Sequence, residues 1–158
     1  MQDQHNHFMQ QALALAAEGI ELGHGGPFGA LVVVADRVVG QGWNQVIHRN
    51  DPTAHAEILA IREACANLQT FHLSEATLYS TCEPCPMCLG ALYWARIETL
   101  VYGATAEDAA EVGFDDHLIR QALRHPIQQQ NLRVIQHNRK ESRRLFSRWH
   151  VSDKRVDY

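Results

Sequence analysis

The chain has 158 residues, a formal net charge of −4, and 46% hydrophobic against 20% charged residues. This composition is that of an ordinary globular protein, and the length suits one domain with a single core. No apolar run reaches the roughly twenty residues that a membrane helix needs, and residues 1–10 lack the pattern of a secretory signal. We therefore expect one domain over residues 1–158, located in the cytoplasm and without membrane contact.

The first predicted elements are a helix and a hairpin. Apolar residues at three- and four-residue steps predict a first helix of about twenty residues, which the glycine-rich segment 23–27 ends. The β-rich runs 30–34 and 38–43 follow, with a turn-length gap around Asp36 and Arg37, so they predict a β-hairpin. The apolar stripe of the first helix consists of Phe8, Met9, Ala12, Leu15, Ala16, Gly19 and Leu22.

Helices and strands alternate in the rest of the chain. Asp51, Pro52 and Thr53 predict a helix that starts there and runs through Ala64, with His55 in its first turn. Further elements are predicted at 77–81 (strand), 86–94 (helix), 100–102 (strand), 117–124 (helix), 132–136 (strand) and 139–149 (helix). This order after a hairpin predicts an α/β fold whose mixed sheet is covered by helices on both faces.

Charge is unevenly distributed along the chain. Residues 139–158 contain seven Lys and Arg against three Asp and Glu, so this tail carries +4 and the remainder −8. A basic terminal helix is most often solvated or docked on the body, and a partner subunit or nucleic acid is the alternative contact. The acidic remainder repels phosphates, which disfavours nucleic acid as a partner.

Two short segments hold the candidate catalytic residues: His55-Ala56-Glu57 and Pro84-Cys85-Pro86-Met87-Cys88. Cys85 and Cys88 are three residues apart at a predicted helix start, so both sulfurs can bind one ion, and the helix terminus favours their thiolate forms. One imidazole and two thiolates are typical ligands of catalytic zinc, which keeps a fourth position open for water. Glu57 is then free to act as a general acid and base.

A structural metal site is the alternative interpretation of these cysteines. Cys82, Cys85 and Cys88 could belong to a closed four-ligand site completed by His55 or by a distant histidine such as His72, and a lone Cys-x-x-Cys can also be a redox motif. Because a structural site has no use for a non-ligand carboxylate, Glu57 favours the catalytic interpretation over a zinc-stabilised binding module.

The two segments resemble the His-x-Glu and Pro-Cys-x-x-Cys signature of the zinc-dependent cytidine deaminase superfamily, and within it the chain is most similar to the bacterial guanine deaminases. The similarity extends over the segments Gly26–Ala30, Asn50–Glu57, Ser80–Ala91, Tyr93–Arg96 and Gly113–Asp116, with Tyr158 as a further match. The resemblance implies a three-layer α/β/α sandwich with a five-stranded mixed sheet. It also implies one Zn²⁺ per subunit, bound by His55, Cys85 and Cys88, and hydrolysis of guanine to xanthine and ammonia.

The same resemblance implies further site residues. Glu57 would transfer protons, Asn44 and Ala56 would contact the purine, and Phe28 and Trp94 would line the pocket. Asp116 and Tyr158 would contribute to recognition and catalysis, with the tail 139–158 exchanged between the subunits of a homodimer so that Tyr158 closes the partner's site.

Alternatives stay open for these residues and for the substrate. Asn44 could instead be a turn residue, and Phe28 and Trp94 could be ordinary core aromatics. Asp116 could mark the start of a helix, and Tyr158 could be a frayed terminal residue. A tRNA adenosine deaminase, or a deaminase of guanosine, cytosine or an aminotriazine, would use the same zinc chemistry.

Overall fold

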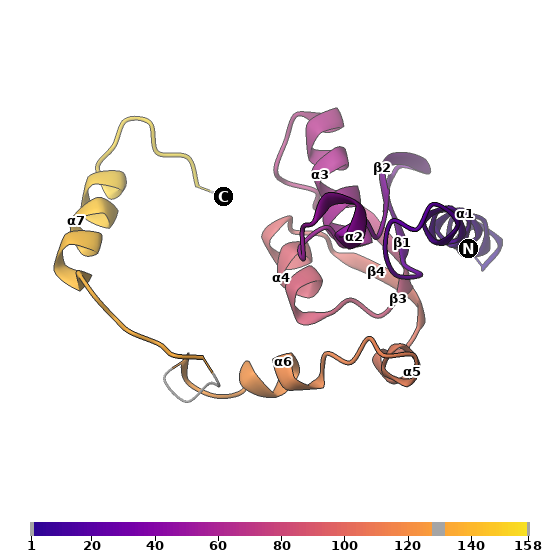
Figure 1. Ribbon diagram of the computed structural model, residues 1–158. Helices are drawn as coiled ribbons and strands as arrows, with labels where there is room; N and C mark the ends of the chain where they lie inside the picture. Colours follow the sequence, from indigo (N-terminus) through magenta and orange to yellow (C-terminus); the bar gives the residue numbers. More distant parts are fainter. Residues whose placement is uncertain (1, 128–131, 158) are drawn as a thin grey trace. The chain divides into compact units, whose positions relative to one another are not determined.

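The computed structural model describes residues 2–127 and 132–157 and divides into two compact units, Met1–Asp116 and His117–Tyr158. The first unit is built on one four-stranded sheet in the order β2-β1-β3-β4 (Figure 1). The strands are β1 (Gly29–Val34), β2 (Arg37–Trp43), β3 (Thr77–Cys82) and β4 (Thr99–Ala104). Strand β1 pairs antiparallel with β2 and β3, whereas β3 and β4 are parallel, so the sheet is mixed as predicted.

Helices cover both faces of this sheet, which confirms the three-layer α/β/α prediction (Figure 1). Because side chains alternate along a strand, Leu31 and Val33 point to one face of β1, and Ala30 and Val32 point to the other. Helix α1 (Gln2–Glu21) packs on the first face. Helices α3 (Ala56–Leu68) and α4 (Pro86–Trp94) pack on the second, where the larger core cluster lies.

Glycines in β2 let α3 approach the sheet closely. A Cβ atom at Gly40 would lie 2.2 Å from the backbone oxygen of Ala60, and one at Gly42 would lie 2.7 Å from that of Ala56. The backbone of α3 therefore lies directly on β2. This contact fixes the start of α3, and hence His55, relative to the sheet.

Two sequence predictions are wrong in detail. The helix predicted to start at Asp51 to Thr53 begins at Ala56 instead, because the Asp51 carboxylate accepts hydrogen bonds from the backbone and hydroxyl of Thr53 and forms a turn. The strand predicted at 132–136 is absent, so the described residues form four strands rather than five. Alternating apolar residues form a strand only where another strand pairs with them, and alternation alone does not supply that partner.

Two short helices were not predicted from the sequence. Helix α2 (Val46–Arg49) spans only four residues, too few for a hydrophobic period. Helix α5 (Ala106–Glu111) follows β4 and starts with a capping box, in which the Thr105 and Asp108 side chains each bond the other's backbone amide.

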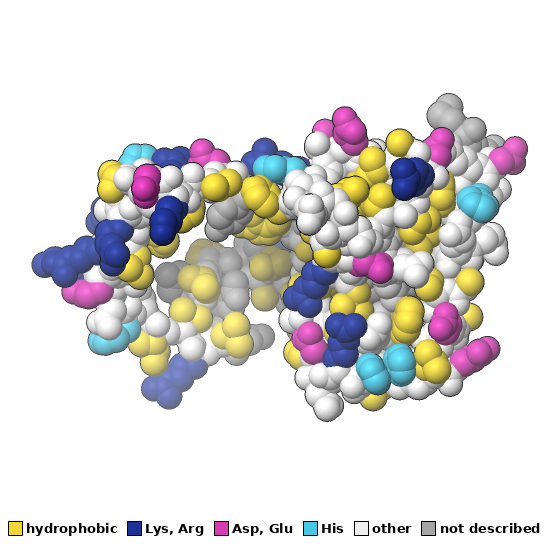
Figure 2. All heavy atoms as spheres, turned by 90° about the horizontal axis from the view of Figure 1, so that it is seen from above, with side chains coloured by type: hydrophobic (Ala, Val, Ile, Leu, Met, Phe, Trp, Pro, Cys, Tyr) yellow, Lys and Arg dark blue, Asp and Glu magenta, His cyan; other side chains and the backbone are white. Residues whose placement is uncertain are grey.

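The second unit contains α6 (His117–Ala122) and α7 (Arg139–His150), and none of its described side chains is fully buried. It has ten Lys and Arg against three Asp and Glu, whereas the first unit has four against fifteen. Figure 2 shows dark blue Lys and Arg side chains along the second unit and at separate places on the first. Throughout the described residues, every helix is too short or too polar to cross a bilayer.

Candidate active site

The candidate metal ligands lie at the N-termini of two helices that pack on the same face of the sheet. His55 is the N-cap of α3 and Cys85 is the N-cap of α4, and both have extended backbone angles. Pro86 and Cys88 both lie in the first turn of α4. The prediction that Cys85 lies near a helix cap is confirmed. His55, predicted inside the first turn of its helix, instead precedes it.

These three side chains converge on one point. The His55 Nδ1 atom lies 3.6 Å from Cys85 Sγ and 3.5 Å from Cys88 Sγ, and all three ligand atoms lie within 4.8 Å of one another. Ligands at about 2.3 Å (sulfur) and about 2.0 Å (nitrogen) from a tetrahedral zinc ion are about 3.5 Å apart. The donor set and its spacing therefore fit zinc.

Cys82 does not join this group. Its thiol donates a hydrogen bond to the backbone oxygen of Thr105 at 3.5 Å, and burial raises its pKa. In the part of the chain that the structure describes, His55, Cys85 and Cys88 form the one cluster suited to a metal ion, without Cys82 or His72. Three protein ligands leave a position open, which rules against the closed four-ligand site considered from the sequence.

The two ligand cysteines differ in the direction of their pKa shifts. Its contacts with Cys88 and His55 lower the pKa of Cys85 to about 4 despite burial. The contact with Cys85, together with burial, raises the pKa of Cys88, and hydrogen bonding with Cys85 raises the pKa of His55. Cys85 is therefore the cysteine whose thiolate form the site favours more strongly.

Glu57 lies beside this group without belonging to it. Its side chain is buried, and its Oε2 atom accepts a hydrogen bond from Cys88 Sγ at 3.5 Å. Its Oε1 atom lies 3.4 Å from the hydroxyl of Ser80 on β3. Burial raises the pKa of the Glu57 carboxyl, which suits a group that must both take and return a proton near neutral pH.

Asn44 is held in one orientation at the end of β2. Its Oδ1 atom accepts hydrogen bonds from the backbone amides of Gly26 and Val46, both at 3.2 Å. The residue is only 5% exposed. A Cβ atom at Gly25 would lie 2.0 Å from Oδ1, so the glycine leaves space for the amide.

The other predicted contact residues differ in how deeply they are buried. Ala56 is fully buried at the start of α3, and the half-buried ring of Phe28 packs edge-on against Phe114 with centroids 4.9 Å apart. Trp94 ends α4 and is 70% exposed, so it is no core aromatic. Asp116 is half-buried and is the last residue of the first unit. Tyr158 lies outside the described residues.

Sequence reasoning missed three residues near these groups. Ser80 carries the hydroxyl beside Glu57, Gly25 makes room for Asn44, and Phe114 packs on Phe28. Ser80 leaves a detectable signal, since it is a polar residue on the strand face that also carries Leu78. The other two contacts depend on loop conformation, which residue spacing does not reveal.

Comparisons with known proteins agree with this geometry. Residues 2–104 match the family described as the cytidine and deoxycytidylate deaminase zinc-binding region. Guanine deaminase of Bacillus subtilis is 43% identical over 98% of this chain and 99% of its own. A tRNA-specific adenosine deaminase of Haemophilus influenzae is 43% identical over 73% of this chain and 69% of its own.

Solved structures of guanine deaminases also match this chain. The crystal structure of the Bacillus subtilis guanine deaminase matches with a TM-score of 0.93 over 98% of both chains. The guanine deaminase of Nitrosomonas europaea matches with a TM-score of 0.66 and 35% identity, over 70% of this chain and 64% of its own. These similarities agree with the group of residues that fits zinc and with the buried glutamate beside it. The chain therefore belongs to the cytidine and deoxycytidylate deaminase zinc-binding family.

Proposed function

We propose that this protein is a zinc-dependent guanine deaminase that hydrolyses guanine to xanthine and ammonia. The observation that carries the proposal is the similarity to a guanine deaminase over nearly the whole of both chains, including the segment after residue 116. The tRNA deaminase of Haemophilus influenzae shares a smaller part of the chain. The strongly acidic first unit also opposes binding of a tRNA backbone.

Within this proposal, His55, Cys85 and Cys88 hold zinc, which when bound supplies an activated water. Glu57 would accept one proton from the attacking water as its oxygen bonds to C2 of guanine, and would give that proton to the ring nitrogen beside C2. Glu57 would then take the second proton from the new hydroxyl on C2 and give it to the amino group, which leaves as ammonia. Its burial keeps bulk water from competing for these protons.

Asn44 supplies part of the recognition. Because two backbone amides occupy its Oδ1, the side chain presents its NH₂ group as a donor. A donor suits an acceptor on the base, such as the carbonyl oxygen of guanine, and disfavours an amino group at the same position. Ala56, Phe28 and Trp94 serve as pocket walls, and Asp116 and Tyr158 as further recognition and catalytic groups.

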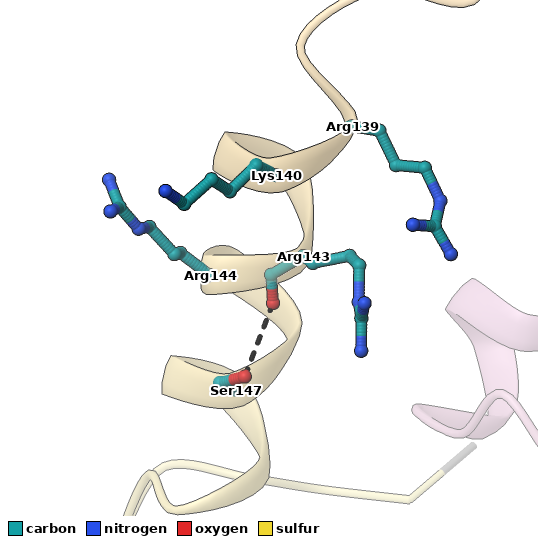
Figure 3. Close-up of a pocket in the computed structure, with 5 residues that line it drawn as sticks. All are labelled: Arg139, Lys140, Arg143, Arg144 and Ser147. Carbon is teal, nitrogen blue, oxygen red and sulfur yellow. Dashed lines mark hydrogen bonds between the residues drawn. The ribbon is translucent and has the colours of Figure 1, made fainter.

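The second unit is proposed to complete the site of a partner subunit in a homodimer. Leu145, Phe146 and Trp149 of α7 are exposed and fall on one side of the helix by their spacing. The opposite side forms a concave basic surface of about 500 Å³, where Arg139 and Arg143 point one way and Lys140 and Arg144 the other (Figure 3). A basic unit that exposes an apolar stripe is complementary in charge to the acidic first unit of a partner subunit.

The substrate is tested by ammonia release from a panel of guanine, guanosine, adenine, cytosine and an aminotriazine, with a tRNA substrate as a further arm. We expect guanine to have the highest kcat/KM, with xanthine as its product. Turnover of another member with no activity on guanine would overturn the proposal while leaving the zinc chemistry intact.

The four cysteines form no disulfide with one another, which supports a location in the reducing cytoplasm.

A further inference from the structure

Ser80 is a buried hydroxyl residue in the middle of an otherwise apolar sheet face. It lies on β3, opposite Ala30 of β1 and Tyr102 of β4, and is 1% exposed. Leu78, two residues earlier on the same face, is completely buried in the core cluster beneath α3. An apolar side chain would suit this strand position better, because a buried hydroxyl must find a hydrogen-bond partner.

The partner of that hydroxyl is Glu57. Ser80 Oγ lies 3.4 Å from Glu57 Oε1 and has no other side-chain contact of this kind within residues 2–127 and 132–157. The second carboxylate oxygen, Oε2, lies 3.5 Å from Cys88 Sγ and so faces the metal-ligand group. The two oxygens of Glu57 thus face different surroundings, Oε1 the sheet and Oε2 the ligands.

Of the two side-chain contacts that the carboxylate makes within the described residues, only the one with Ser80 is independent of the metal-ligand group. A carboxylate has a broad terminal torsion, so without this contact its plane turns more freely away from the direction that it has here.

We propose that Ser80 is a positioning residue, which holds Oε1 of Glu57 against the sheet and so keeps Oε2 directed at the reacting water. The inference rests on the proposed role of Glu57 in proton transfer. A positioning role of this kind acts on the rate of the chemical step and leaves substrate affinity and metal content unchanged.

Two substitutions of equal shape test the hydroxyl itself. Ser80→Thr and Ser80→Val add the same branched bulk, but only threonine keeps the donor. We expect Ser80→Thr to have a kcat about tenfold above that of Ser80→Val, with KM within about twofold and equal zinc content. Equal kcat values for the two variants would overturn the inference.

A double-mutant cycle supplies the readout if the branched residues prevent folding. Ser80→Ala should lower kcat about tenfold in the wild-type background and leave the residual turnover of Glu57→Gln unchanged, because Ser80 acts through Glu57. A tenfold loss in both backgrounds would show a general structural effect and overturn the positioning role. In crystals of zinc-loaded Ser80→Ala, the Glu57 carboxylate should turn away from its wild-type orientation, whereas an unchanged orientation would contradict the inference.

Failure of this inference differs from failure of the proposed function. If the wild-type protein does not convert guanine, the proposed substrate is wrong, and the same variants are compared on the base that is converted. If the wild type converts guanine and Ser80→Ala does so equally fast, the function stands and the role of Ser80 falls.

Discussion

His55 Nδ1 lies 3.5 Å from Cys88 Sγ, although 33 residues separate the two in sequence. The contact exists because α3 and α4 pack on the same sheet face with their N-termini together. Helix N-termini stabilise nearby negative charge, so this arrangement favours a thiolate beside the imidazole. The fold therefore brings the three candidate ligands together from two distant segments.

Loss of a ligand should cost both zinc and stability. His55→Ala or Cys88→Ala should abolish stoichiometric zinc binding and lower the free energy of unfolding by about 4 kcal/mol at zinc concentrations a thousandfold above the wild-type Kd. Metal analysis and urea unfolding with and without zinc measure this. Cys65→Ala is the matched control, because Cys65 lies on α3, packs against the core cluster outside the ligand group, and its loss should leave the zinc content unchanged. A Cys88→Ala variant with full zinc content would contradict the ligand assignment.

Proton release on zinc binding should report the unequal cysteines. At pH 7, Cys85 with a pKa of about 4 is already ionised, Cys88 with its raised pKa must lose one proton, and His55 loses a fraction. The total should lie between about one and two protons and rise toward about two at pH 5.5, as His55 becomes fully protonated. Calorimetry in buffers of different ionisation enthalpy measures it. About three protons at pH 5.5 would contradict the low pKa of Cys85.

Gly25→Ala should impair substrate recognition through Asn44. The added Cβ would lie 2.0 Å from Asn44 Oδ1, so the amide must move from the position that Gly26 and Val46 define. We expect kcat/KM for guanine to fall at least about tenfold with zinc content unchanged, since a misplaced donor leaves the base unpaired. In Gly90→Ala, the control, the new Cβ meets nothing within 4 Å and activity should be retained. An unchanged kcat/KM in Gly25→Ala would refute the role of Gly25 in positioning Asn44 for substrate recognition.

Subunit mixing tests the exchanged tail. A chain truncated after Asn138 should be impaired in dimerisation and guanine turnover, and full-length Glu57→Gln should also be nearly inactive. If the tail of one subunit completes the site of the other, a mixture of the two should regain activity, because Glu57 comes from one chain and the tail from its partner. Light scattering reports the dimer, and a mixture of full-length Glu57→Gln and Cys88→Ala tests for activity that does not need the exchange. A truncated chain that stays dimeric and fully active would exclude the proposal.

The sequence predicted the number of strands less well than the positions of the metal ligands. Hydrophobic periodicity located α1, and β-rich runs with a short gap located the β1–β2 hairpin. Pro86 located the start of α4, and the cysteine spacing located the ligands, because each of these signals is local. The start of α3 was misplaced, since Asp51 can cap either a helix or a turn and only tertiary packing decides. The strand at 132–136 was wrongly predicted, because alternation cannot show whether a partner edge exists. The Ser80 contact joins residues 23 apart, which local patterns do not connect.

The central claim, that a zinc-bound water reacts with the help of Glu57, is tested most directly by Glu57→Gln. Glutamine keeps the shape of the buried side chain and cannot accept the proton. Zinc content and guanine turnover should be measured on the same preparation, beside the wild type. We expect one zinc per chain in both proteins and a kcat about a thousandfold lower in the variant. Turnover at the wild-type rate in a zinc-loaded Glu57→Gln protein would contradict the account.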